Sequence, residues 1–319
     1  MARSQNMFPG LALLALGAVA ALISCSSSGG KDEGSSANRK SEVITQLSFE
    51  TANDALSALR IAADENDLEY LREIFGPEAS ELSSDDPERD NAERLRFAAA
   101  MREFCELRPI EGGVGGFHVI VGASRIEFPV PLMQHDGRWM FDTLAGVEAM
   151  IDYRVGVNEI RTLAAMRDLP GLQREYFAVD RDGDGIQEYA QRMRSSPGMR
   201  DGLYWESRDN EPDSPLGPYA ANAAEAYQEG LGYNGYEYRI LTGQGAGAPG
   251  GARSYMKGKD MVHGFAFIAV PAIYDRTGVM TFIVGPDGVV YEKDLGPNTK
   301  GVAAAISLFD PAGWSKSED

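Results

Sequence analysis

The phrase DRDGDG at residues 180–185 is the clearest candidate for chemistry in this chain of 319 residues. Carboxylates at alternate positions of a tight loop can converge on a hard cation, as in the first six positions of an EF-hand loop. The second half departs from that pattern, because Gln191 stands where an EF-hand has a bidentate Glu. The alternating carboxylates of the first half predict a calcium site. The alternative is a solvated Asp-Gly turn without an ion. The predicted ligands are Asp180, Asp182, Asp184 and Glu188.

A second candidate pairs two acids with two aromatic residues. Asp201 and Glu206 flank Tyr204 and Trp205. Two carboxyl groups can act as acid and base in glycoside hydrolysis, and their separation in space decides the mechanism. Sugars also stack on aromatic rings, so one interpretation is a hydrolase of envelope glycan or peptide. In the other interpretation, Tyr204 and Trp205 are core anchors and Asp201 lies in a turn.

The glycine-rich residues 243–251 do not follow the spacing of a phosphate-binding loop. We expect these glycines to let the backbone cross closely packed elements between two strands. The three histidines, His118, His135 and His263, lack the spacing of a metal site.

The N-terminus has the pattern of an export signal. An uncharged, apolar run of about 16 residues begins at Phe8, which suits a signal peptide and is short for a membrane span of roughly 20 residues. The residues Leu22, Ile23 and Ser24 before Cys25 resemble the lipobox of bacterial lipoproteins. We predict a signal peptide at residues 1–24, a lipid on Cys25 and a flexible tether at residues 25–46. The alternatives are a secreted protein with a chance cysteine and an uncleaved anchor.

Charge narrows the range of partners. The formal net charge is −18, which repels the phosphate backbone of nucleic acid and attracts divalent cations. We therefore expect no nucleic-acid partner. Ser26 resembles an outer-membrane sorting signal, so the expected location is the cell envelope, at the outer membrane facing the periplasm. With Cys25 acylated, Cys105 is the remaining thiol, and its helical sequence context predicts a small buried hydrophobe.

Residues 47–145 are predicted to form one α+β domain. Helical spacing covers residues 49–63, 68–75 and 92–107, and alternation of period two follows at residues 118–122, 126–131 and 137–143. Asp136-Gly137 is typical of a hairpin turn. The order resembles nuclear-transport-factor-2-like domains, whose helices cover a curved sheet. A pocket near Trp139 and Phe141 would make this domain a small-ligand carrier.

Residues 146–319 are predicted to form a second α+β domain. A long helix begins at Gly146 and ends before Pro170, and a shorter one covers residues 172–177. An irregular excursion at residues 197–218 is expected to pack through Tyr204 and Trp205, before a short helix at residues 221–227. Strands are predicted at residues 236–241, 264–270, 279–285 and 289–295. A long helix followed by an antiparallel meander resembles the periplasmic head of pseudopilins.

Several phrases of the chain are similar, in order, to one bacterial family. They are DTLAGVEAM, DRDGDGIQEYA, SSPGMRDGLYW, NGYEYRILTGQGAGAPGGA and GFAFIAVPA. The chain resembles the family of domain of unknown function 2950 (DUF2950) from about Phe49 to Trp314. The resemblance implies an exported or lipid-anchored bacterial protein and brings no activity to transfer.

These observations favour a non-catalytic binding or assembly module of the cell envelope, stabilised by calcium and recognising an envelope protein or glycan. The alternatives are the hydrolase, with Asp201 and Glu206 as acid and base, and the carrier. A cleft joining the two acids would favour the hydrolase, and a deep apolar cavity in the first domain would favour the carrier.

Overall fold

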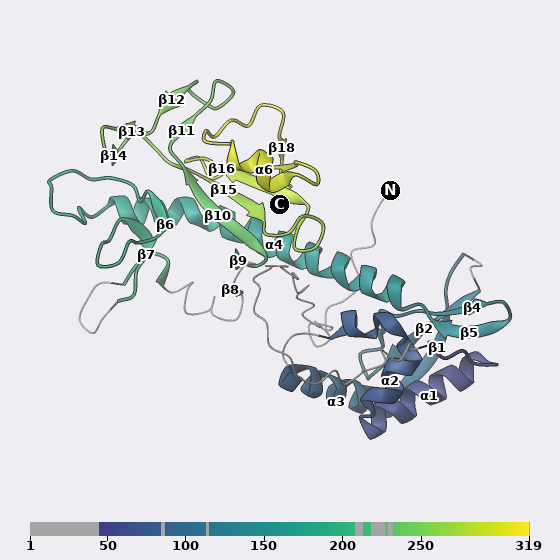
Figure 1. Cartoon of the computed structure of the whole chain (residues 1–319). Helices are drawn as coiled ribbons and strands as arrows, with labels where there is room; N and C mark the ends of the chain where they lie inside the picture. The colour runs from purple at the N-terminus through teal and green to yellow at the C-terminus, as the bar shows by residue number, and fades with distance from the viewer. Residues whose placement is uncertain are drawn as a thin grey trace, which may run out of the picture. The chain divides into compact units, whose positions relative to one another are not determined.

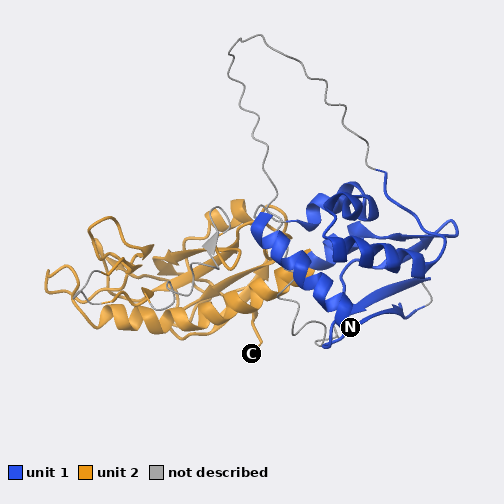
Figure 2. Ribbon diagram, turned by 90° about the horizontal axis from the view of Figure 1, so that it is seen from below, with its two compact units in different colours: residues 1–150 blue, residues 151–319 orange. Residues whose placement is uncertain are grey.

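The computed structural model describes residues 45–83, 87–112, 115–207, 213–217, 227–228 and 232–318. The predicted signal peptide, the lipidation site at Cys25 and nearly all of the tether lie outside these residues, as do residues 221–226 of the predicted short helix. The fold is α+β, as predicted. The chain divides into two compact units, residues 1–150 and 151–319 (Figure 2).

Unit 1 begins with three α-helices and a short 3-10 helix. They are α1 (Ala52–Glu65), α2 (Leu68–Phe75), η1 (Pro77–Leu82) and α3 (Pro87–Glu103). A capping box between Thr51 and Asp54 starts α1. Asp67 caps α2 by accepting two backbone N–H bonds, and Gly76, at φ 76°, ends it. The first two predicted helices are therefore confirmed.

An antiparallel sheet completes unit 1. Its strands are β1 (Cys105–Pro109), β2 (Gly116–Val121), β3 (Ile126–Glu127), β4 (Leu132–His135) and β5 (Arg138–Phe141). The order is β1-β2-β4-β5, and β3 also pairs with β2. Asp136 and Gly137 both have positive φ, at 49° and 80°, as a type I′ turn requires. The predicted hairpin is confirmed, with His135 opposite Arg138.

Cys105 does not lie on a helix, so that prediction is wrong. The third helix ends at Glu103, and Cys105 opens β1, where it pairs with Val121 of β2. The local sequence favours helix, but pairing with a distant strand satisfies the same backbone groups and overrides that preference. The side chain is half-buried, and burial raises the pKa of its thiol against the opposing charge of Arg60.

Unit 2 contains a seven-stranded antiparallel sheet (Figure 1). The order is β18 (Ser315–Lys316), β17 (Val290–Asp294), β16 (Met280–Val284), β15 (Ala266–Pro271), β10 (Tyr236–Leu241), β9 (Gly232–Tyr233) and β8 (Tyr227–Gln228). The four predicted strands are confirmed as β10, β15, β16 and β17. Shorter pairs are β6 (Arg192–Arg194) with β7 (Gly202–Tyr204), β11 (Gly243–Gln244) with β12 (Arg253–Ser254), and β13 (Met256–Lys257) with β14 (Asp260–Met261).

Two helices contact opposite faces of this sheet. Tyr238 of β10 donates its hydroxyl to Thr162 Oγ1 of α4 (Thr143–Phe177) at 3.2 Å. The next residue, Arg239, donates to the carbonyls of Ala303 and Ile306 at 2.8 Å, at the end of α6 (Thr299–Ala304). Because successive strand residues point to opposite faces, α4 and α6 cover different sides of β10. The buried core includes residues of both helices, among them Met166 and Leu169 of α4 and Ala303 of α6, together with the strands of the sheet.

Helix α4 begins in unit 1, continues in unit 2 and does not stop before Pro170, so the predicted break is wrong. Proline removes one backbone hydrogen bond and tends to kink a helix. Here Met166, Leu169 and Leu172 are all buried in the core on either side of it. Tertiary packing supplies most helical stability in proteins, which explains why the helix persists. Among the described residues, no helix combines the length and apolar character that crossing a membrane requires.

Candidate metal site

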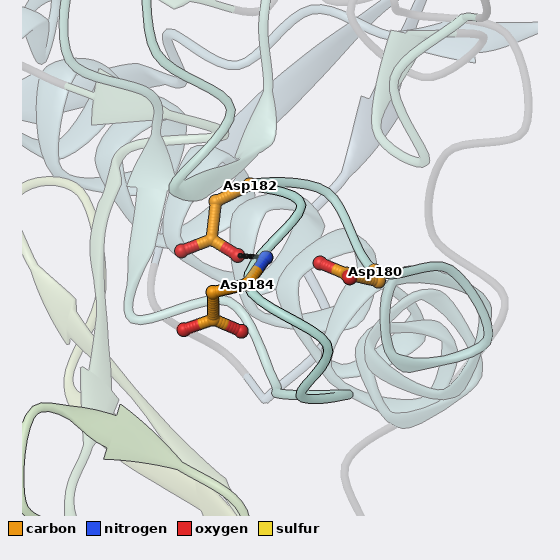
Figure 3. Close-up of side chains that lie close together, drawn as sticks. All are labelled: Asp180, Asp182 and Asp184. Carbon is orange, nitrogen blue, oxygen red and sulfur yellow. Dashed lines mark hydrogen bonds between the residues drawn. The ribbon is translucent and has the colours of Figure 1, made fainter.

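The Asp-Gly loop follows the end of α4, and its own carboxylates close it. Figure 3 shows its three aspartates, with the backbone N–H of Asp184 donating to Asp182. Asp180 Oδ1 accepts the N–H of Gly183 at 2.8 Å, and Asp180 Oδ2 accepts the N–H of Gly185 at 2.9 Å. Both glycines have positive φ, at 79° and 85°, which only glycine adopts without strain. The glycines therefore let the chain turn back toward the Asp180 carboxylate.

The three aspartates of the loop lie close enough to share one ion. One carboxylate oxygen from each of Asp180, Asp182 and Asp184 lies within 4.8 Å of the others, and the group is at the surface. Calcium binds oxygen at 2.3–2.6 Å, so two of its ligands stand at most about 5 Å apart. The predicted convergence of these carboxylates is observed, and its geometry fits a hard cation with oxygen ligands.

Glu188, the fourth predicted ligand, is not part of this group. Its Oε2 accepts the side-chain N–H of Gln191 at 3.5 Å. Burial raises the pKa of Glu188, and the negative charges of Asp182 and Asp260 raise it further. In contrast, the amides of Gly185 and Gly183 lower the pKa of Asp180, so its carboxylate stays ionised well below neutral pH.

A lysine from a distant hairpin reaches the same carboxylates. Lys259, between β13 and β14, places Nζ 3.2 Å from Asp184 Oδ2, 3.8 Å from Asp182 Oδ2 and 3.7 Å from Asp260 Oδ1. Its hydrogen bond to Asp184, with the charges around it, raises the pKa of the ammonium. Sequence reasoning missed this residue, because 75 positions separate it from Asp184. The ammonium of Lys259 therefore supplies a positive charge to Asp182 and Asp184, two of the three candidate ligands.

The second residue of the loop connects it to the core of unit 2. The guanidinium carbon of Arg181 lies 5.0 Å from the ring centres of both Tyr176 and Trp205. Arg200 lies 5.8 Å from the same indole. Trp205 is buried, with 7% of its surface exposed, so it is the core anchor that the alternative reading predicted. Cation–π contacts thus join the loop to two buried aromatic side chains.

The two acids proposed for hydrolysis both pair with neighbours on the β6–β7 element. Asp201 accepts the backbone N–H of Ser196 at 2.7 Å and its hydroxyl at 2.9 Å, and Arg192 Nε lies 3.3 Å away. Burial raises the pKa of Asp201, but these partners more than offset it and lower the pKa overall. Glu206 pairs with Arg194 at 3.2 Å, and its side chain is 78% exposed. A general acid works best with a pKa near the operating pH, which Asp201 does not have.

The glycine-rich loop is closely packed, as expected. A Cβ on Gly245 or Gly247 would collide with the carboxylate of Asp310. Gln244 organises the loop by donating its amide to the carbonyls of Pro249 and Gly251 at 2.8 and 2.7 Å. The loop therefore surrounds a carboxylate of its own chain.

Unit 1 contains a cavity of about 400 Å³ between α2, η1, α3 and residues 128–130. Trp139 and Phe141 do not line it. Phe141 is buried in the core, where its ring centre lies 5.5 Å from that of Phe75, and Trp139 packs 5.2 Å from Phe117. Phe141 is therefore a core residue, Trp139 is half-buried against Phe117, and the cavity lies elsewhere in the unit.

Comparison with known proteins identifies the family. The sequence model of the family described as "Protein of unknown function (DUF2950)" matches residues 46–317, most of the chain, which confirms the resemblance seen in the sequence. No curated protein and no solved structure matches the chain. The chain belongs to the DUF2950 family.

Proposed function

We propose that this chain is an exported, lipid-anchored protein of the bacterial cell envelope, whose folded part is a non-catalytic binding or assembly module with a calcium site in the loop at residues 180–185. The apolar run before Cys25 and its lipobox-like ending support export and lipidation. Ser26 supports the outer membrane, facing the periplasm. The proposed partner is an envelope protein or glycan.

The observation that carries the calcium site is the approach of the three aspartate oxygens to within 4.8 Å of one another. Like charges this close repel, and a divalent ion at their centre removes that repulsion while using all three as ligands. With only three protein carboxylates the cage is incomplete, so we expect a dissociation constant at the weak end of calcium sites, roughly 10⁻⁴ to 10⁻³ M.

We propose a binding module and not a hydrolase because Asp201 has a structural role in its own turn. Both of its carboxylate oxygens are hydrogen-bonded to Ser196, so they hold the turn before β7. Glu206 lies in an exposed ion pair with Arg194. These are structural roles that account for both acids without a substrate.

The element order also supports a finer assignment of each unit. We propose a nuclear-transport-factor-2-like arrangement for unit 1, where helices α1 to α3 precede and contact an antiparallel sheet. For unit 2 we propose a pseudopilin-head-like arrangement, in which the long helix α4 precedes an antiparallel meander. Neither likeness carries an activity with it.

The calcium site is tested by changing Asp182 and Asp184 together to Asn. In the unchanged chain, calcium at a hundredfold excess over its dissociation constant stabilises the folded state by about 2.7 kcal/mol, which appears as a rise in Tm. The double variant should lose this rise and keep its fold. Asp152→Asn with Asp168→Asn, two exposed aspartates of α4, makes the same charge change and should keep it. An unchanged Tm with calcium, or an equal rise in both double variants, contradicts the site.

The anchor is tested by Cys25→Ala in the bacterial host. We expect the unchanged chain to incorporate labelled fatty acid and to sediment with membranes, because two or more acyl chains are enough for stable anchoring. The variant should do neither. Fatty-acid labelling that survives the substitution would show that the lipid is attached elsewhere or that the chain is not a lipoprotein.

A further inference from the structure

We infer that the cavity of unit 1 is a binding site for a small amphipathic amine, an apolar molecule that carries a protonated amino group at one end. This inference is independent of the calcium site, which lies in unit 2.

The size and lining of the cavity fit an apolar ligand body. Its volume of about 400 Å³ lies within the usual range of ligand pockets, roughly 300–1,000 Å³. Its wall is made mainly of aliphatic and aromatic side chains. These include Leu68, Leu71, Phe75, Phe97, Phe128 and Val130. An apolar molecule gains by leaving water for such a surface.

One carboxylate in this wall has an unused hydrogen-bonding position. Glu93 of α3 lines the cavity, and its side chain is only 8% exposed. Oε1 accepts a hydrogen bond from Arg96 at 3.1 Å, whereas Oε2 is buried and accepts none within the part of the chain that the structure describes. Leaving a buried charged oxygen unpaired is costly, so a donor that reaches Glu93 from the cavity removes that cost. The last torsion of a Glu side chain is soft, which lets the carboxylate turn toward such a donor.

The chemistry of the wall selects a cation. A carboxylate only accepts hydrogen bonds, and an ammonium donates one while also placing a positive charge beside the buried negative one, which a hydroxyl does not do. Asp90, also buried at 6% exposure, adds a second negative charge to the same wall. Of the two arginines in the wall, Arg94 donates to Asn66 and Asn91, at 3.0 and 3.4 Å, and Arg72 is exposed to solvent. The charged side chains that are buried in the wall are therefore both acidic.

The test compares three probes of equal chain length, decylamine, decanol and decanoate, by calorimetric titration below their micelle concentrations. It uses residues 26–319, which include every helix and strand that the structure describes. We expect decylamine to bind about tenfold more tightly than decanol, and decanoate to bind least. Glu93→Gln should weaken decylamine about tenfold and change decanol less than about twofold. Glu103→Gln, at the end of the same helix and outside the cavity wall, should change neither.

A second variant separates the cavity from general attraction of amines to a chain of net charge −18. Ala79→Phe places a ring in the cavity from η1 and keeps every charge, so it should weaken decylamine and decanol alike. Circular dichroism and Tm establish whether each variant is folded. If Glu93→Gln does not fold, the affinity order of the three probes and the effect of Ala79→Phe test the inference. Decanoate binding as well as decylamine, decylamine binding unchanged by Ala79→Phe, or no binding of any probe would overturn the inference.

Discussion

Removing the ammonium of Lys259 should strengthen calcium binding to the Asp-Gly loop. Its Nζ lies 3.2 Å from Asp184 Oδ2 and 3.8 Å from Asp182 Oδ2, so an ion that uses these oxygens must displace it. An exposed ion pair typically changes an equilibrium constant by a factor of about 1.5 to 5. Two such pairs share one flexible side chain that is 74% exposed, so their effects do not add fully. We expect Lys259→Gln to tighten calcium binding about three- to tenfold.

The assay is a calcium titration followed through Tm and through tryptophan fluorescence, at low salt because screening weakens surface charges. Without calcium, Lys259→Gln should melt slightly below the unchanged chain, since its carboxylates then repel without a counter-charge. Lys257→Gln is the matched control, because Lys257 lies on the same hairpin and forms no ion pair with any described residue. Equal calcium affinity in the two variants would refute the idea that the ammonium and calcium compete for the same oxygens.

Two further predictions concern α4. Gly146→Ala should destabilise the fold by about 1–3 kcal/mol, because its Cβ would lie 2.5 Å from Val130 Cγ2. Gly156→Ala should stabilise the fold by about 0.5–1 kcal/mol, because a Cβ there has nothing within 4 Å. Urea unfolding measures both changes. Burial, followed by the charge of Glu188, raises the pKa of Tyr176 to about 12. The neutral phenol is therefore favoured in the folded state, and its contribution is complete below the ordinary tyrosine pKa near 10 and is lost as pH rises through about 12. Tyr176→Phe should flatten that part of the stability profile, and an unchanged profile would contradict the assignment.

The elements that sequence reasoning identified are those with a strong local pattern. Short apolar, β-branched and aromatic runs identify β10, β15, β16 and β17, of which β15 and β16 are almost entirely buried. The Asp136-Gly137 turn needs two positive φ values that few other pairs adopt. The aspartates of the loop converge because five residues of sequence bring them together whatever the rest of the chain does. Local chemistry was sufficient in each of these cases.

What sequence reasoning missed depends on contacts between distant residues. Pro170 has the pattern of a helix end, but buried neighbours on both sides keep α4 continuous. Cys105 follows a helical pattern, but pairing with Val121 places it in a strand. The cavity lies beside Glu93 and not beside Trp139. The ring of Phe117 packs against Trp139, whereas the space next to Glu93 stays open. No local sequence pattern predicts these features, because each depends on contacts with residues far along the chain.

The alternation of residues in the Asp-Gly loop explains how the candidate ion site is connected to the core. Asp180 and Asp182 contribute oxygens to the cluster, while Arg181 between them turns to the rings of Tyr176 and Trp205, 5.0 Å away. The arginine is held by buried groups, so it limits how far the two carboxylates can move apart. A site whose ligands are already held together loses less conformational entropy on binding than a free acidic loop does. The cation–π contacts of Arg181 would therefore support the proposed cation site, although the arginine carries a positive charge itself.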